Sequence, residues 1–348
     1  MNTVPPTFAE VLKSIESPSG LSASLARNAF DAVLAGTWTQ AQIAGLLMAL
    51  RLRGETPEVI AAAADSMRAA MLRVEHAFVR VLDTCGTGGD GQGTLNLSTA
   101  AAIIAASTGI VVAKHGNRAV SSRAGSADVL EQLGVVLALD AANTSNILKS
   151  VGISFMLAPM HHPAMRHAMP VRRELGVRTI FNCLGPLANP AGATHQLLGA
   201  FSNEIRPVLG QTLRQLGTDR AWVVFGRDGL DEVSPFGPTL VSEVTHAGVT
   251  ELEITPEDFG INCSTAGAIA GGDAAHNARA LEAILSGQPH PATDAIVLNA
   301  AAALVVAEGF EPKAATDKAR QAIATGAALG KLKEWCIATK SAQAASRN

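Results

Sequence analysis

The feature that most constrains the fold is a change of pattern near residue 77. Before it, apolar side chains recur at helical spacing, and after it short apolar runs alternate with helical stretches. These runs cover residues 78–82, 110–113, 135–139, 153–157 and 222–225. Such alternation is typical of βαβ units and predicts an α/β fold with a mostly parallel central sheet. Residues 240–254 instead alternate apolar and polar side chains, which predicts antiparallel strands at the sheet edge.

Helix-capping patterns organise the first part of the chain. Thr7 and Glu10 form a capping box, and Thr39 precedes a second helical run. Thr56 precedes a third, with Pro57 at the first helical position. No strand pattern interrupts these runs, so the sequence predicts a small all-helical domain at the N-terminal end.

The length of the chain, 348 residues, exceeds the roughly 250–300 residues at which a single core stops growing. We therefore expect the helical domain to cover residues 1–74, next to a larger α/β domain. A proline- and arginine-rich stretch at about 163–190 is expected to return to the helical domain. The α/β domain is then left with residues 75–162 and 191–348.

The composition places the chain among globular proteins. Hydrophobic residues make up 48% and charged residues 16%, with a net charge of −3, which excludes disorder, coiled coil and collagen. The near-neutral charge argues against a nucleic-acid binder, and aromatic platforms for base stacking are scarce because tyrosine is absent. We expect no nucleic-acid partner.

Cysteine spacing and the N-terminal sequence bear on the compartment. Cys85, Cys183, Cys263 and Cys336 lie far apart without CxxC spacing, which favours a reducing compartment over a disulfide framework. The N-terminus shows no secretory signal pattern, and no apolar run approaches the ~20 residues that span a bilayer. We therefore expect a cytoplasmic protein with no membrane partner.

The strongest chemical motif is the glycine-rich segment at residues 83–91. Gly86, Gly88 and Gly91 satisfy G-x-G-x-x-G, a dinucleotide-binding fingerprint. However, the next helix cap is expected only at Ser98 or Thr99, and the acid that would bind a ribose about 20 residues further on is missing. No G-K-[ST] follows either. We therefore predict a glycine backbone that approaches phosphate oxygens and leads into a helix N-terminus.

Three further segments are expected to meet this loop at the carboxyl edge of the sheet, where ligands of parallel sheets bind. Residues 114–118, Lys-His-Gly-Asn-Arg, supply two cations, and residues 121–126 add a hydroxyl-rich loop. Asp231 and Glu232 close the turn after the apolar run at 222–225. Adjacent acids beside a phosphate site suit Mg²⁺, although a solvated turn is the commoner role of such a pair.

Other chemistries find less support in the sequence. His161 and His162 are neighbours that cannot share one helix face, so a zinc site is not expected. Cys85 is interpreted as a small residue packed under the glycine loop rather than a nucleophile. No G-x-S-x-G nucleophile elbow is present.

Together and in order, these motifs resemble the anthranilate phosphoribosyltransferases. The resemblance rests on residues 86–91, 96–99, 114–118, 121–122, 125–128, 162–165, 171–173, 178–182, 185–187 and 228–232. It implies a nucleoside phosphorylase-like, class III phosphoribosyltransferase architecture, with a helical domain built from two sequence segments, and a homodimer. The implied reaction transfers the 5-phosphoribosyl group from 5-phosphoribosyl 1-pyrophosphate to the amine of anthranilate, in tryptophan biosynthesis. Pyrophosphate is released, and no covalent nucleophile or strong general base is implied.

The resemblance also assigns roles to single residues. It implies two Mg²⁺ ions per subunit, served by Ser98, Asp231 and Glu232, and an anthranilate site formed by Gly86, His115, Asn117, His162 and Arg172. Phosphoribosyl pyrophosphate is expected to contact the glycine loop, the following helix N-terminus and the 114–126 segment, at Gly86, Gly89, Asp90, Thr94, Asn96, Leu97, Ser98, Thr99, Lys114, His115, Gly116, Asn117, Arg118, Ala119, Val120, Ser121, Ser122 and Ser126.

The phase of the predicted helix decides which of the two neighbouring arginines, Arg172 or Arg173, faces the cleft. Residues 171–175 are expected to be helical after Pro170, so the two side chains point about 100° apart and only one can face the cleft. The resemblance selects Arg172. Charge matching supports this choice, because a guanidinium both neutralises and orients a carboxylate.

One position departs from the family pattern, and two other functions stay open. Family members often carry a histidine where Phe225 stands, which we interpret as a core position at a strand end. A pyrimidine nucleoside phosphorylase shares the architecture, but its glycine loop lacks the Thr-Gly-Gly-Asp-Gly order and it has no counterpart of Arg172. A non-catalytic nucleic-acid-binding relative of the same fold is disfavoured by the acidic balance and the intact acidic pair at 231–232.

Overall fold

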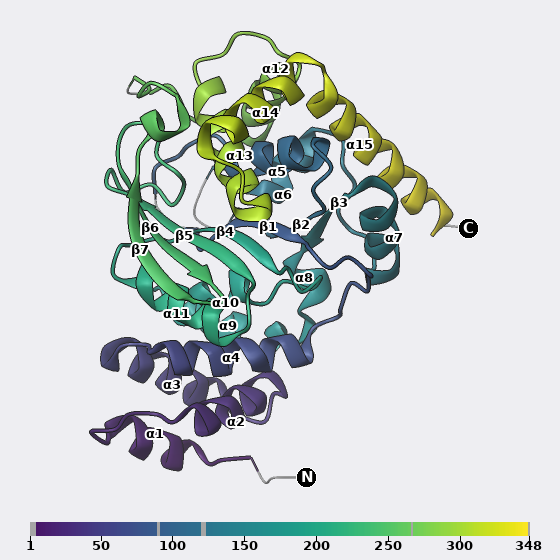
Figure 1. The fold of residues 1–348 in the computed structure, drawn as a ribbon. Coiled ribbons are helices and arrows are strands. Elements are labelled where there is room, and N and C mark those ends of the chain that lie inside the picture. Colours follow the sequence, from purple (N-terminus) through teal and green to yellow (C-terminus); the bar gives the residue numbers. More distant parts are fainter. Residues whose placement is uncertain (1–4, 89–90, 120–122, 266, 347–348) are drawn as a thin grey trace.

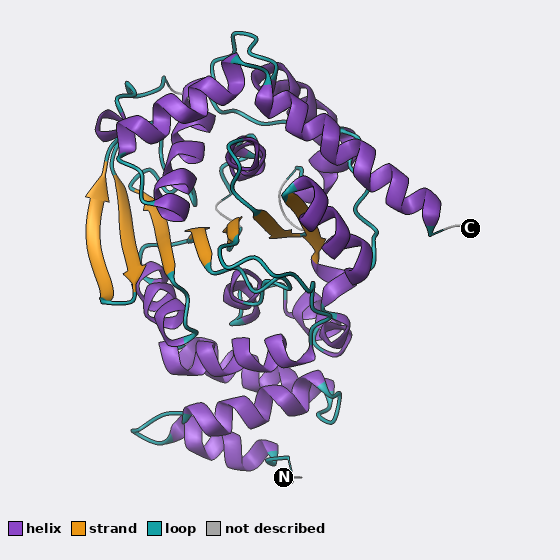
Figure 2. Cartoon of the chain, turned by 45° about the vertical axis from the view of Figure 1, so that its right-hand side comes forward, coloured by secondary structure: helices purple, strands orange, loops and turns teal. Residues whose placement is uncertain are grey.

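The structure, a computed structural model, describes residues 5–88, 91–119, 123–265 and 267–346. A central sheet carries helices on both faces, and a separate stack of helices lies beyond one of those faces (Figure 1 and Figure 2). The strands of the sheet are β1 (Leu82–Gly86), β2 (Val112–Gly116), β3 (Ile153–Leu157), β4 (His195–Gly199), β5 (Arg220–Gly226), β6 (Thr239–Thr245) and β7 (Gly248–Ile254).

The sheet has the order β3-β2-β1-β4-β5-β6-β7. The first five strands of this order run parallel to one another. β6 and β7 form an antiparallel hairpin on the outside of β5. The predicted α/β fold, with a mostly parallel sheet and an antiparallel edge, is confirmed.

Two of the predicted strands are displaced from their apolar runs. β1 begins at Leu82, so the expected strand at 78–82 is wrong except at its last residue. β1 continues through Asp83 and Thr84, which are polar and fully buried, and apolar patterning cannot detect such residues. β2 is shifted in the same direction, to 112–116, because it includes the buried Lys114 and His115.

One predicted strand is absent and one observed strand was not predicted. Residues 135–139 form no strand, although Val135, Leu137 and Leu139 are buried in the core, so this run packs without pairing. β4 was missed because its first two residues, His195 and Gln196, are polar yet buried.

One face of the sheet is covered by helices from the 97–151 region and from the C-terminal part. They are α5 (Leu97–Ser107), α6 (Ser126–Gln132), α7 (Ala141–Val151), α12 (Ala274–Leu285), α13 (Thr293–Glu308), α14 (Pro312–Ala324) and α15 (Ala327–Ala345), with the short η2 (Pro256–Phe259). α5 and α13 consist largely of buried alanine, valine, leucine and isoleucine. Small side chains allow two helices to approach closely, and these two form the centre of the larger core.

The opposite face carries α8 (Ala158–His161), η1 (Pro163–His167), α9 (Met169–Leu175), α10 (Phe181–Leu187) and α11 (Ile205–Gln215). The helical unit α1 (Phe8–Glu16), α2 (Ala23–Leu34), α3 (Gln40–Arg53) and α4 (Pro57–Ala70) lies beyond them (Figure 1). One apolar cluster joins the two sets, because Val171, Phe181 and Leu184 pack with residues such as Phe30 and Leu47. Residues 163–187 therefore share a core with α1–α4.

The helix ends follow the predicted capping chemistry in the N-terminal unit. Thr7 and Thr39 both form capping boxes, and Pro57 occupies the first turn of α4 after Thr56. The expected cap of α5 at Ser98 or Thr99 is wrong. Asn96 is the N-cap and the helix begins at Leu97, so Ser98 lies in its first turn.

Within the described residues, no single helix is both long and apolar enough to cross a membrane.

Candidate active site

The sheet order places a crevice at its carboxyl edge. β1 has β2 on one side and β4 on the other, and the connections run in opposite directions from it. Ligands of open parallel sheets bind at such a switch point. The glycine loop follows β1, the 117–126 segment follows β2, and the turn with Asp231 and Glu232 follows β5. The structure thus brings the described residues of these segments to one edge.

The glycine loop presents exposed backbone. Gly86 and Gly88 are exposed, and Gly88 and Gly91 have positive φ values of 67° and 74°. A Cβ at Gly88 or Gly91 would meet nothing within 4 Å, so conformation rather than space calls for glycine there. Gly89 and Asp90, two predicted phosphate contacts, lie outside the described residues.

The acidic turn lies directly against the ends of β1 and β4. Asp231 Oδ2 is 3.0 Å from the point where a Cβ on Gly86 would stand. The carbonyl oxygen of Asp231 is only 1.6 Å from the corresponding point at Gly199, so any side chain there would displace the turn. Glu232 Oε1 accepts a hydrogen bond from the backbone N–H of Ser98 at 3.2 Å. Both carboxylates are partly exposed beside the glycine loop.

Lys114 reaches the same place from β2. Its side chain is buried, and the ammonium donates to the carbonyl oxygen of Thr84 and to Ser98 Oγ at 3.3 Å. Burial lowers the pKa of Lys114, and the nearby Asp83 carboxylate opposes that shift. Ser98 thus contacts the buried cation through its hydroxyl and the acidic turn through its backbone N–H.

The segment after β2 is folded onto the start of α6. Asp128 Oδ2 accepts hydrogen bonds from the backbone N–H groups of Ala119 and Gly125, both at 2.9 Å. Arg118, a predicted contact of phosphoribosyl pyrophosphate, donates two hydrogen bonds of 2.6 Å to Glu131 and is thus held in an ion pair. A Cβ on Gly125 would lie 2.4 Å from Ala119 N, which explains a glycine at this close approach. The predicted contacts Val120, Ser121 and Ser122 lie outside the described residues.

Asn117, Gly116 and Ser126 meet at the base of this segment. Asn117 is exposed, and its side-chain oxygen accepts from the N–H of Arg118 at 2.8 Å. Ser126 Oγ would lie 2.6 Å from a Cβ on Gly116, so the hydroxyl sits against the bare end of β2. The structure therefore brings these three predicted residues together.

The strand-like segment before α5 is tied to a part of the chain that sequence reasoning did not connect with it. Thr94 forms a bridge with Ala270, and Asn96 Oδ1 accepts from the side chain of the buried Asn277 at 3.0 Å. Leu97 and Thr99 are fully buried, so they support α5 from behind rather than facing the crevice. The Thr99 hydroxyl has no hydrogen-bond partner among the described residues.

His115 and His162 form a buried pair, with ring centroids 5.0 Å apart. His115 Nδ1 lies 2.9 Å from the carbonyl oxygen of Gly185, so this nitrogen carries the proton and Nε2 is an acceptor. The Nε2 atoms of both rings are buried without a partner in the described part of the chain. Burial lowers the pKa of His115 to about 3 and that of His162 to about 4, so both rings are neutral at pH 7.

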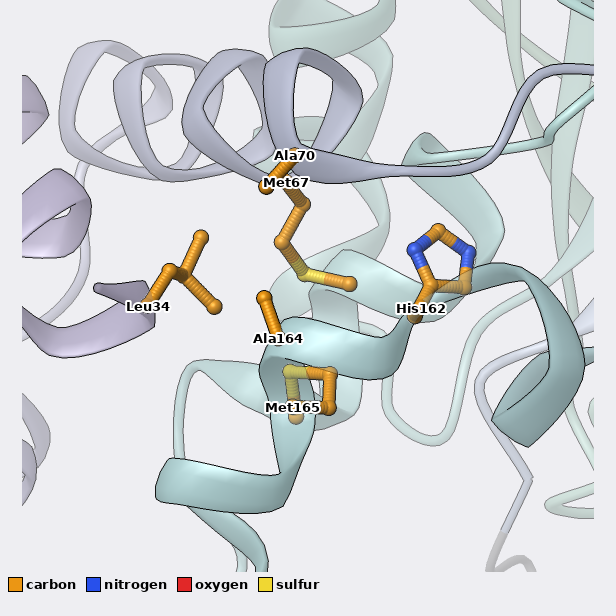
Figure 3. Close-up of a pocket in the computed structure, with 6 residues that line it drawn as sticks. All are labelled: Leu34, Met67, Ala70, His162, Ala164 and Met165. Carbon is orange, nitrogen blue, oxygen red and sulfur yellow. The ribbon is translucent and has the colours of Figure 1, made fainter. Parts of the chain in front are cut away.

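His162 also faces the helical unit. Its ring and Met67 of α4 point toward one another, with Ala164 and Met165 below them (Figure 3). The space enclosed by these side chains is too small for a water molecule. The helical unit therefore closes tightly over the turn that carries His162.

The helix phase predicted for the two arginines agrees with their exposure. Arg172 of α9 is half-buried, with its guanidinium carbon 5.4 Å from the ring centre of Phe181, and burial lowers its pKa. Arg173 is exposed. Phe225, the departure from the family pattern, lies at the end of β5 as expected, but it is only half-buried, opposite Leu240, so it is not the core position we predicted.

A second hollow, which sequence reasoning did not predict, lies beyond the end of β4. It is a cleft of about 410 Å³ between α3, the 178–179 turn and the start of α11. The guanidinium of Arg178 stacks on Phe201 at 4.3 Å, and Arg51 donates to the carbonyl oxygen of Arg178.

Within the described residues, no group of three His, Cys, Asp or Glu side chains forms a metal site.

Comparisons with known proteins agree with this architecture. A model described as "Glycosyl transferase family, helical bundle domain" matches residues 9–71, and one described as "Glycosyl transferase family, a/b domain" matches residues 79–329. The chain is 48% identical over 332 residues to the anthranilate phosphoribosyltransferase of a Bradyrhizobium species, with 95% of this chain and 98% of that protein covered.

Solved structures of the same kind superpose closely. The crystal structure of anthranilate phosphoribosyltransferase from Thermus thermophilus has a TM-score of 0.89 at 41% identity, covering 96% of this chain and 99% of that one. The Saccharomyces cerevisiae enzyme in complex with PRPP and Mg has a TM-score of 0.88 at 29% identity, covering 96% and 98%. Its complex with 4-fluoroanthranilate has a TM-score of 0.87 at 28% identity, with the same coverage.

The fold and the site define a glycosyl transferase with a helical bundle and an a/b domain. Among these proteins, the chain belongs to the anthranilate phosphoribosyltransferases. It is an enzyme that transfers the 5-phosphoribosyl group of 5-phosphoribosyl 1-pyrophosphate to the amine of anthranilate, with release of pyrophosphate, in tryptophan biosynthesis. This assignment favours phosphoribosyl transfer over the nucleoside phosphorylase and the nucleic-acid-binding alternatives.

Proposed function

We propose that the phosphoribosyl transfer takes place in the crevice at the carboxyl ends of β1, β2, β4 and β5. The observation that carries this proposal is the position of Ser98. Its backbone N–H contacts Glu232 and its hydroxyl contacts Lys114, so the glycine loop, the cation of β2 and the acidic turn converge on the first turn of one helix. A helix N-terminus with a cation and hydroxyls is suited to a pyrophosphate group.

Magnesium fits the acidic side of this crevice. Asp231 and Glu232 offer partly exposed carboxylate oxygens next to the exposed Gly86, and hard oxygen ligands beside a phosphate site suit this ion. The yeast relative's complex with PRPP and Mg supports the same choice. We propose two ions per subunit, held by Asp231, Glu232 and Ser98. Magnesium, when bound, supplies positive charge to the pyrophosphate leaving group.

The protein side of the reaction is mainly electrostatic. Cleavage of the bond to pyrophosphate builds negative charge on the leaving group, which Lys114 and the N–H groups at the start of α5 can neutralise without reorganising. The amine of anthranilate is weakly basic and attacks as the free amine. The neutral His115 has an acceptor at Nε2 but a pKa of only about 3, so His115 is not a strong base for the amine. Alignment of the two substrates supplies the rest of the rate.

We place anthranilate on the other side of the crevice. Arg172 would bind the carboxylate, with Asn117 and Gly86 near the amine and the neutral rings of His115 and His162 lining the approach. The partial burial of Arg172 strengthens a charge-assisted hydrogen bond to a carboxylate. The yeast relative's complex with 4-fluoroanthranilate supports a site for a small aromatic acid.

The remaining predicted contacts with phosphoribosyl pyrophosphate stay proposals. They include the described residues that face the crevice and those outside the described part of the chain.

We also propose that residues 1–74 and about 163–190 form one helical domain, which the shared apolar cluster supports. A homodimer in the cytoplasm is proposed on the family resemblance, and the four free cysteines fit a reducing compartment.

The activity is tested by mixing the protein with anthranilate, phosphoribosyl pyrophosphate and Mg²⁺ and following the loss of anthranilate fluorescence. A loss that requires all three components supports the proposal. Phosphorolysis of uridine or thymidine in phosphate buffer, without anthranilate turnover, would favour the nucleoside phosphorylase alternative. Salt-dependent retention on DNA, with neither activity, would favour the nucleic-acid-binding alternative.

A further inference from the structure

β1 and β2 are neighbours in the sheet, but they part almost at once. Among the described residues, they pair only at Leu82 and Val112, whereas β1 pairs with β4 along all its residues from Leu82 to Gly86. Beyond Leu82, side chains replace the backbone ladder. The Asp83 carboxylate accepts the N–H of His115 at 3.1 Å, and the Lys114 ammonium donates to the carbonyl oxygen of Thr84.

Asp83 also reaches the segment that returns from the helical unit. Its second carboxylate oxygen accepts from Asn189 Nδ2 at 2.8 Å. The same amide nitrogen donates to the carbonyl oxygen of Ala113 at 2.8 Å, and the side-chain oxygen of Asn189 accepts the N–H of Ala191 at 2.9 Å. Asp83 and Asn189 therefore bind the backbone of β2 at Ala113 and His115, on the side of the strand that faces β1.

Burying the carboxylate of Asp83 has an unfavourable desolvation free energy. Asp83 is fully buried, and burial raises its pKa to about 6 against the opposing charge of Lys114. Two neighbouring strands need no side chain to satisfy their backbone groups, because a regular ladder would do so. A carboxylate is favourable here only because the two strands are separated and the ammonium of Lys114 lies close to it, in contact with β1 and the start of α5.

We propose that Asp83 is a positioning residue for the transfer, whose carboxylate holds the end of β2 away from β1 at the spacing that places Lys114 against Ser98. Asp83 itself does not touch substrate. It acts through the N–H of His115, and Asn189 fixes its orientation. This inference rests on the proposed function of the crevice, since it concerns how the phosphoribosyl pyrophosphate side of that crevice is held open.

The test compares Asp83→Asn with a matched control, Gln196→Met, in the full-length protein. Gln196 is a buried polar residue on the neighbouring β4. It donates to the carbonyl oxygen of Pro186 at 2.7 Å and to Cys85 Sγ at 3.8 Å, and neither bond reaches β2. An amide at position 83 cannot accept from both His115 and Asn189. We expect the KM for phosphoribosyl pyrophosphate to rise on the order of tenfold to a hundredfold, as loss of a hydrogen bond to a charged group implies.

The KM for anthranilate and kcat at saturation should change by much less in Asp83→Asn. Gln196→Met should lower the melting temperature and leave both KM values unchanged. A folded Asp83→Asn variant with an unchanged KM for phosphoribosyl pyrophosphate would overturn the inference, as would an equal rise in Gln196→Met.

If Asp83→Asn does not fold, Asn189→Ala carries the test, because it removes one of the two bonds to Asp83 and leaves the charge in place. A several-fold rise in the same KM supports the inference, and an unchanged KM overturns it. A wild-type protein that transfers no phosphoribosyl group would instead refute the proposed function.

Discussion

The backbone N–H of Ser98 donates to the carboxylate of Glu232 at 3.2 Å, so the first turn of α5 and the turn after β5 are in direct contact. The strands β2 to β5 lie between Ser98 and Glu232 in the sequence. The contact places an acidic pair at the positive end of a helix dipole, where a metal and a pyrophosphate group can both be accommodated.

The double variant Asp231→Asn/Glu232→Gln tests the metal assignment. It removes both carboxylate charges without changing shape, so the Mg²⁺ concentration for half-maximal rate should rise and the maximal rate should fall. Glu253→Gln is the control, since Glu253 is an acid on the edge strand β7 that pairs with Arg227. Unchanged magnesium dependence in the double variant would show that the metal is held elsewhere.

Gly199→Ala tests the position of the acidic turn without touching its charges. A Cβ at Gly199 would stand 1.6 Å from the carbonyl oxygen of Asp231, so the turn must move. We expect a loss of activity and a higher magnesium requirement. Gly330→Ala in α15, where a Cβ meets nothing within 4 Å, should instead be stabilising by about 0.5–1 kcal/mol and fully active. Normal magnesium titration of a folded Gly199→Ala protein would contradict the proposal.

Arg172→Ala and Arg173→Ala separate the two arginines of α9. Arg172→Ala should raise the KM for anthranilate on the order of tenfold to a hundredfold, because a charge-assisted hydrogen bond is lost. The KM for phosphoribosyl pyrophosphate should hardly change, and Arg173→Ala should be nearly silent because Arg173 is exposed. The reverse order of effects would place Arg173 at the carboxylate, and two silent variants would place the carboxylate elsewhere.

The buried histidines predict how stability depends on pH. The pKa of His115 is about 3 and that of His162 about 4 in the folded protein, below the ordinary value near 6.5. The unfolded chain therefore binds protons first as the pH falls. Each ring contributes stability above about pH 6.5 that is lost toward pH 4, at about 1.4 kcal/mol per pH unit.

Asp83 acts in the opposite direction, because its pKa is raised to about 6 and its contribution is lost as the pH rises toward that value. A variant must therefore isolate the histidine effect. His162→Gln should flatten the fall in melting temperature between pH 7 and 5, and His246→Gln, whose side chain is 82% exposed, should not. Parallel curves for wild type and His162→Gln would contradict the assignment.

Much of the architecture could be predicted because apolar periodicity and helix-capping residues indicate where helices and strands lie. The run at 153–157 matches β3 residue for residue, and the alternation at 240–254 gives the β6–β7 hairpin. β1, β2 and β4 were displaced or missed for one reason. They carry buried polar residues such as Asp83, Lys114 and Gln196, whose partners lie far away in sequence.

The same limit applies to the site. Glycine and charge patterns pointed to Lys114, Glu232 and the glycine loop, which the structure brings to one edge. Asp83 begins the glycine-rich motif, but no role was predicted for it, and Asn189 was not singled out, because an aspartate in a strand and an asparagine before a proline have many ordinary roles. Their connection exists only once the 163–190 segment has folded back against β1 and β2.

That return of the chain has a consequence for synthesis on the ribosome. The helices α1–α4 are translated first, but the apolar residues that pack against them, such as Val171 and Phe181 and then Leu209 of α11, follow only after β3. While β1–β3 emerge, the inner faces of α3 and α4 stay uncovered and exposed to other nascent chains. A stalled fragment that ends before residue 163 should therefore bind holdase chaperones, and one that extends past α11 should be released from them.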